Sequence, residues 1–193
     1  MDLSLSSVVA LLRETLSDPK ASARRIMALP LPMSARWQAL LLVVVLSVLF
    51  GQLSVLLMTE AGMPNPLQAG VVQGMALLIM VFAAHGVGRL MGGRGQFDQA
   101  LILVVWLQAV MVAIQLVQVV ALLVVPALSA LIGVLGMALF LWLLTNYVAV
   151  LHGFESLGKV FAVILLTLFG IAMVLAMLLQ MLGIAPPGMV VDV

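Results

Sequence analysis

Four long stretches without a charged side chain constrain this sequence more than any other feature. Residues 37–59, 61–88, 99–154 and 160–191 contain no Asp, Glu, Lys or Arg. A helix that crosses the hydrocarbon core of a membrane needs about 20 predominantly apolar residues. The first, second and fourth stretches therefore suit one span each. The third suits two, with a turn near Pro126–Ser129 because proline cannot continue the helical hydrogen-bond ladder.

The fold class predicted from this pattern is an all-α, polytopic membrane helix bundle with five transmembrane helices. The spans are expected at residues 37–58, 67–87, 100–125, 127–151 and 160–182. An N-terminal region of amphipathic or interfacial helices, residues 1–36, precedes them, and a short tail, residues 183–193, follows them. The composition agrees, since 65% of the residues are hydrophobic and 8% are charged, whereas soluble domains have about 45–50% apolar and about 25% charged residues.

The basic residues predict the orientation of the bundle. Arg13, Lys20, Arg24, Arg25 and Arg36 precede the first span, Arg89 and Arg94 lie between spans two and three, and Lys159 lies between spans four and five. All eight basic residues therefore fall on one side, which the positive-inside rule makes cytoplasmic. We expect a cytoplasmic N-terminus and a periplasmic C-terminus.

The N-terminal region contains signals for two short helices. At 100° per residue, the apolar side chains Leu5, Val8, Val9, Leu12 and Leu16 fall on one arc. This pattern predicts an amphipathic helix that lies on the inner membrane face or against the bundle. Asp18-Pro19 is typical of a cap followed by proline at the first helical position, and it predicts a second helix to about Ala28.

Several function classes are disfavoured by what the sequence lacks. The net charge is +1, so there is no basic field to bind nucleic acid. The chain has no cysteine, which excludes disulfides and thiolate chemistry. No ionisable side chain lies in the middle of a predicted span, where proton-coupled and ion-coupled transporters need one. We expect no enzyme activity, no catalytic residue, no metal and no cofactor.

Neutral polar side chains nevertheless occur deep in the spans. Gln108, Gln115 and Gln118 lie within about 80° of one another on the third span. With Asn146 on the fourth span, they are candidates for an interface or a polar path. The alternative is that they form interhelical hydrogen bonds, which contribute about 0.6 kcal/mol each on average.

Pairs of glycines predict places where helices approach closely. Gly70 and Gly74 form a small-xxx-small pattern in the second span, and Gly133 and Gly136 have a similar place in the fourth. Packing within the chain is favoured over dimerisation.

The predicted cytoplasmic face gathers two histidines and several charged residues. This cluster consists of His85, Arg94, Asp98, His152, Glu155 and Lys159. A metal or acid–base site would require a histidine and a carboxylate to converge, and the alternative is a ring of polar residues that solvates the helix ends. Gly92-Gly93-Arg94-Gly95 lacks the Lys-Ser or Lys-Thr of a phosphate-binding loop and is expected to be a flexible turn.

Two of these turns carry a family resemblance. Gly92-Gly93-Arg94-Gly95-Gln96-Phe97-Asp98-Gln99-Ala100, and His152-Gly153 followed by Leu157-Gly158-Lys159 and Ala162-Val163, resemble the Yip1 family. The resemblance covers about residues 86–175 and implies five spans with a cytoplasmic N-terminus. Eukaryotic members are linked to vesicle traffic and small GTPases through an Asp-Leu-Tyr-Gly-Pro motif. This motif is absent from the sequence, so GTPase binding is not expected.

The leading hypothesis is a non-catalytic, multi-pass protein of the bacterial inner membrane. It would be an accessory or scaffold subunit, or an organiser of lipid at the cytoplasmic face. The expected partners are membrane lipids and either another membrane protein or further copies of the chain. A channel or carrier for a small neutral solute, lined by the glutamines and Asn146, is the main alternative. An intramembrane enzyme that relies on His85 and His152 is the third.

Overall fold

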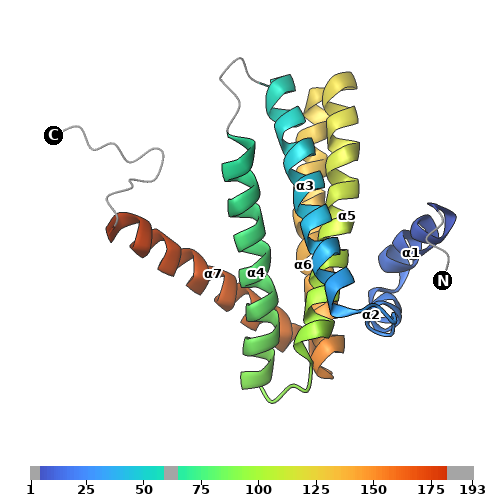
Figure 1. Ribbon diagram of the computed structural model, residues 1–193, viewed down its shortest axis with the longest axis vertical. Coiled ribbons are helices and arrows are strands. Elements are labelled where there is room, and N and C mark those ends of the chain that lie inside the picture. Colours follow the sequence, from blue (N-terminus) through green and yellow to red (C-terminus); the bar gives the residue numbers. More distant parts are fainter. Residues whose placement is uncertain (1–4, 59–64, 182–193) are drawn as a thin grey trace.

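The computed structural model describes residues 5–58 and 65–181, and every regular element in these ranges is a helix (Figure 1). Two short helices are followed by five long ones. Their bounds are α1 Leu5–Ser17, α2 Pro19–Met27, α3 Met33–Met58, α4 Pro66–Leu90, α5 Phe97–Val124, α6 Pro126–His152 and α7 Leu157–Met181. The predicted all-α class and the helical membrane bundle are confirmed.

The five long helices lie where the spans were predicted. Four of them, α3 to α6, are long and apolar enough to cross a membrane. α7 has 25 residues, of which Leu157–Met173 form an apolar stretch with described side chains, and this stretch alone does not establish a crossing. Five crossings and the orientation of both termini therefore stay predictions, and the tail at 183–193 lies outside the described residues.

Local signals in the sequence explain where several helices begin. Proline occupies a first-turn position in α2, α4 and α6, where its missing N–H is not needed. The Asp18 carboxylate accepts a hydrogen bond from the Ala21 N–H at 2.9 Å, which is the predicted cap. The connection between α5 and α6 consists of Val125 alone, so Ser129 belongs to α6 rather than to the turn.

α5 is the centre of the bundle. It packs against α3, α4 and α6, and its first half is buried on all sides. The run Ala100–Val105 is at most 6% exposed at every position. A helix that is apolar all round is expected to be surrounded by others.

The outer surface of the bundle is apolar. Leu41, Leu49, Val134 and Phe169 are each 59–70% exposed, on α3, α6 and α7. An apolar surface that extends over several helices is stable in lipid and not in water. α7 contacts α6 near its start and then slants away from the other helices (Figure 1).

α1 and α2 lie on the side of the bundle away from α7 (Figure 1). Thr15 of α1 and Ser22, Ala23 and Ile26 of α2 are at most 1% exposed. α1 therefore turns its Thr15 face to the bundle. Val9 and Leu16, on the predicted apolar arc, stay more than half exposed.

Candidate functional site

The side chain of His152 lies at the junction of three segments. His152 is the last residue of α6 and is 4% exposed. Gly153 follows it with φ of 74°, a left-handed conformation that ends the helix at this residue. The Gly95 N–H donates to Nδ1 at 3.2 Å, and Nε2 lies 2.9 Å from the carbonyl oxygen of Ala84. Because one ring nitrogen accepts and the other faces an acceptor, this geometry requires the neutral tautomer with its proton on Nε2.

Three glycines form the socket around this ring. A Cβ added at Gly88 or Gly93 would collide with His152, and one at Gly95 would lie 2.6 Å from Cγ of Leu151 and 2.9 Å from Cε1 of His152. The Gly93 N–H also bonds the Gly88 carbonyl at 2.9 Å across Gly92, which has φ of 86°. The glycine-rich segment, expected to be a flexible turn, is instead packed tightly against α6.

The other members of the predicted cytoplasmic cluster do not converge on His152 to form a reactive site. Asp98 pairs with Arg36 across 2.9 Å rather than with a histidine. Arg94, Glu155 and Lys159 are exposed, and no ion pair joins them within residues 5–58 and 65–181. In the same ranges, no three His, Cys, Asp or Glu side chains are placed to hold a metal.

His85 lies in a different environment from His152. Its ring meets Phe97 edge-on, with the ring centroids 5.9 Å apart and an interplanar angle of 88°. Phe97 also contacts Phe82 and Trp37, at centroid distances of 5.3 and 6.4 Å. Nδ1 of His85 is buried and has no hydrogen-bond partner among the described residues. The aromatic contacts join the ends of α3, α4 and α5 at this face.

Arg36 is a structural residue, although in the sequence analysis it served only to predict the orientation of the bundle. It is 8% exposed, and its guanidinium donates to the carboxylate of Asp98, to the backbone carbonyl of the same residue, and to the Leu31 carbonyl at 3.1 Å. These bonds tie the start of α3 to the start of α5. Both residues lie just outside an apolar span, which is the signal that could have suggested the pairing.

Two polar contacts that the sequence did not suggest attach the N-terminal helices. The Trp106 Nε1–H donates to the Thr15 hydroxyl at 2.9 Å, and that hydroxyl donates to the Leu11 carbonyl at 2.8 Å. The hydroxyls of Ser22 and Tyr147 lie 3.4 Å apart. α1 and α2 are therefore fixed to α5 and α6 through buried hydrogen bonds.

The four residues of the candidate polar path have different hydrogen-bond partners. Gln108 donates to the Ser47 hydroxyl of α3 at 2.7 Å, whereas Gln118 donates to the Ser129 carbonyl of α6 at 3.5 Å. Asn146 donates to the Trp142 carbonyl in its own helix at 2.8 Å. The Gln115 side-chain oxygen is buried and accepts no hydrogen bond in the described ranges. Gln108 and Gln118 thus act as interhelical contacts.

The glycine pairs differ in how closely they are packed. A Cβ at Gly70 would lie 4.0 Å from Val48, and one at Gly74 would meet nothing within 4 Å. An added Cβ would thus make at most an ordinary contact at Gly70 and none at Gly74, and close packing at this pair stays a prediction. Gly133 and Gly136 do approach α5, since their added Cβ atoms would lie 3.0 Å from Gln118 and 3.3 Å from Ile114.

Comparison with known proteins gives one match. The family model described as Yip1 domain matches residues 13–179, which include α2 to α6 and the glycine socket of His152. No curated protein and no solved structure matches the chain.

Proposed function

The chain belongs to the Yip1 domain family, and from this premise we propose that it is a non-catalytic integral membrane protein that serves as an accessory or scaffold subunit. Its partner would be another membrane protein or a further copy of the chain. We also propose a bacterial inner membrane as its location, and a cytoplasmic N-terminus because all eight basic residues fall on one predicted side.

The observation that carries this proposal is that buried and half-buried polar side chains form hydrogen bonds between different elements of the chain. His152, Arg36, Gln108 and Trp106 each bond a different helix or connection of the same chain. A catalytic site instead needs reactive groups that face a space open to a substrate. Side chains already committed to holding helices together favour a structural role over a chemical one.

Site-specific photo-crosslinking in native membranes tests this proposal. A photoreactive residue would replace Leu41 or Leu49 of α3, which are 65% and 59% exposed. The matched control would replace Leu101, which is fully buried in α5. We expect a discrete crosslinked species from the exposed positions and none from the control. If both exposed positions yield only lipid adducts of a monomer, the subunit hypothesis fails.

A channel or carrier for a small neutral solute is the second candidate. The observation that favours it is the buried, unpaired side-chain oxygen of Gln115, because such an atom could accept a hydrogen bond from a passing solute. The bonds already made by Gln108 and Gln118 count against it. Flux of glycerol or urea into vesicles that contain the purified protein, lost on Gln115→Leu, would support it. Flux equal to that of empty vesicles would exclude it for these solutes.

A further inference from the structure

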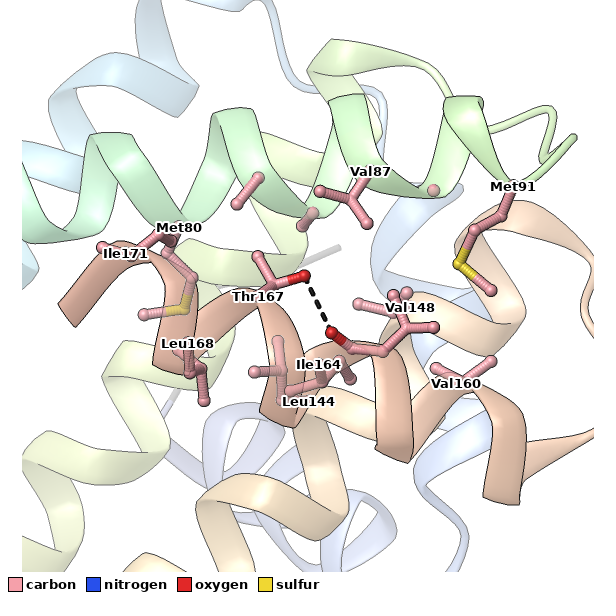
Figure 2. A pocket seen from close by; sticks show the side chains of 14 residues that line it. Met80, Val87, Met91, Leu144, Val148, Val160, Ile164, Thr167, Leu168 and Ile171 are labelled. Carbon is pink, nitrogen blue, oxygen red and sulfur yellow. Dashed lines mark hydrogen bonds between the residues drawn. The ribbon is translucent and has the colours of Figure 1, made fainter. Parts of the chain in front are cut away.

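An apolar groove lies between α4, α6 and α7. α7 starts against α6 and then diverges (Figure 1), and side chains of α4, α6 and α7 line the groove (Figure 2). About 490 Å³ of space lies between its walls, including the part that is open to the surroundings. Residues from all three helices line it, among them Met80, Ala83, Val87, Val148, Ile164 and Thr167.

The lining selects for an apolar occupant. No charged side chain lines the groove, and its one hydroxyl, that of Thr167, donates to the Val163 carbonyl of its own helix at 2.8 Å (Figure 2). Such a lining offers water few hydrogen-bond partners. In a membrane the most abundant molecule that can fill it is an acyl chain.

The size of the groove argues against a partner helix. One turn of a helix, about 10 Å across and about 5.4 Å long, occupies roughly 420 Å³. A partner helix could therefore insert little more than one turn between the walls. A flexible acyl chain can enter without this limit.

Two basic residues adjoin, in the sequence, the residues that line one end of the groove. Gly88 and Met91 of α4 and Val160 of α7 line this end, and Arg89 and Lys159 are their neighbours in sequence. Both cations are exposed, and neither is paired with a carboxylate in residues 5–58 and 65–181. They are available to a lipid phosphate, which arginine and lysine bind well.

We propose that the groove is a phospholipid site, with an acyl chain between α4, α6 and α7 and the headgroup phosphate against Arg89 and Lys159. The site would select anionic lipids, because Arg89 and Lys159 are exposed and neither pairs with a carboxylate in residues 5–58 and 65–181. The proposal requires the chain to be a membrane protein, but it does not depend on the protein partner proposed above.

Photolabelling of the full-length protein tests this assignment. The protein would be reconstituted in vesicles that contain phosphatidylglycerol with a diazirine in its acyl chain, and labelled peptides would be mapped by mass spectrometry. We expect label to concentrate on groove residues such as Met80 and Thr167. Unlabelled phosphatidylglycerol should compete more strongly than phosphatidylcholine.

Two groove-filling variants and one control make the result specific. Ala83→Phe should lower labelling of the groove by roughly tenfold, because its ring would displace about two methylene groups of the bound acyl chain from the groove. Thr167→Phe, on the opposite wall, is the second variant in case Ala83→Phe folds poorly, and it should lower labelling of the groove to a similar extent. Ala76→Phe lies seven residues earlier on the same face of α4, is exposed and does not line the groove, so it should label normally.

Changing the two cations tests the headgroup contact. Arg89→Gln combined with Lys159→Gln should remove the preference for phosphatidylglycerol over phosphatidylcholine, whereas Arg13→Gln on α1 should retain it. An even distribution of label over the exposed faces of α3 to α7, unchanged by Ala83→Phe, would mean that the label comes only from lipid surrounding the protein. This result would overturn the proposal. A groove residue crosslinked to a peptide of another chain would overturn it in favour of a protein contact.

Discussion

Single residues hold distant parts of this chain together through contacts that tolerate little change. His152 bonds Ala84 and Gly95, which are 68 and 57 residues away, and three glycines leave room for its ring. A buried imidazole must keep its hydrogen-bond partners, since an unsatisfied buried group costs about 1–3 kcal/mol. The socket is therefore expected to be sensitive to the addition of a single methyl group.

Gly95→Ala is the residue-scale test of the socket. Its Cβ would lie 2.6 Å from Cγ of Leu151, so the side chains must shift, and we expect a loss of about 1–3 kcal/mol from overpacking. Gly86→Ala is the matched control, because a Cβ there meets nothing within 4 Å. Thermal unfolding in detergent should show a lower Tm for Gly95→Ala than for Gly86→Ala. Equal Tm values would contradict the tight socket.

A second residue-scale prediction concerns the contact between α3 and α5. Gln108→Leu removes the donor to Ser47 and should destabilise the bundle by about 0.6 kcal/mol, the average for such bonds in membranes. Ser47→Ala should cost a similar amount, and the double variant should cost less than the sum of the two. Chemical denaturation of all four proteins in mixed micelles measures this coupling. Strictly additive effects would mean that the two side chains do not interact.

Among the helices, α1 and α2 are attached most specifically, through buried hydroxyls. Thr15 is fully buried and accepts from Trp106, and Ser22 is fully buried beside Tyr147. The outward side of α1 remains apolar at Val9 and Leu16, so it suits the membrane interface. The two helices are thus held by the bundle on one side and are suited to lipid on the other.

Thr15→Val should loosen these two helices. It keeps the shape of the side chain but leaves the Trp106 N–H without its acceptor, at a cost of about 1–3 kcal/mol. We expect faster tryptic cleavage at Lys20, Arg24 or Arg25 in the reconstituted protein. Thr167→Val is the control, because its hydroxyl bonds only its own helix. Cleavage at the wild-type rate in Thr15→Val would show that this hydrogen bond does not hold α1 and α2 in place.

The sequence allowed the positions of the elements to be predicted, because their signals are local. Uncharged stretches located α3 to α7, and Asp18-Pro19 marked the start of α2. Contacts between elements were not predictable in this way. Nothing near His152 indicates Gly95, and the spacing of Gly70 and Gly74 carries no information about the distance to α3. The glutamines were correctly placed on α5, but their different partners depend on how α3 and α6 pack around it.

For the molecule as a whole, the distribution of charge predicts one orientation. The connections from α2 to α3, α4 to α5 and α6 to α7 lie at one end of the bundle, and the α5–α6 connection lies at the other (Figure 1). The basic residues lie in α1 and α2 or in and next to the first group of connections, whereas Val125 and its neighbours carry none. The positive-inside rule therefore makes the first end cytoplasmic.

Single cysteines can test this orientation, because the natural chain has none. Leu128→Cys, near the α5–α6 connection and 45% exposed in the wild type, should react with a membrane-impermeant maleimide in cells whose outer membrane has been permeabilised. Glu155→Cys, in the exposed α6–α7 connection, should react only after the inner membrane is disrupted. The reverse labelling pattern would show that the chain has the opposite orientation in the membrane.

We propose that this Yip1-domain protein works by associating with other molecules in the membrane rather than by catalysis. The most direct measurement is mass spectrometry of the intact protein, extracted in mild detergent from its native membrane. We predict a reproducible complex of fixed stoichiometry with a membrane protein or with further copies of the chain. A bare monomer in every preparation would contradict the account.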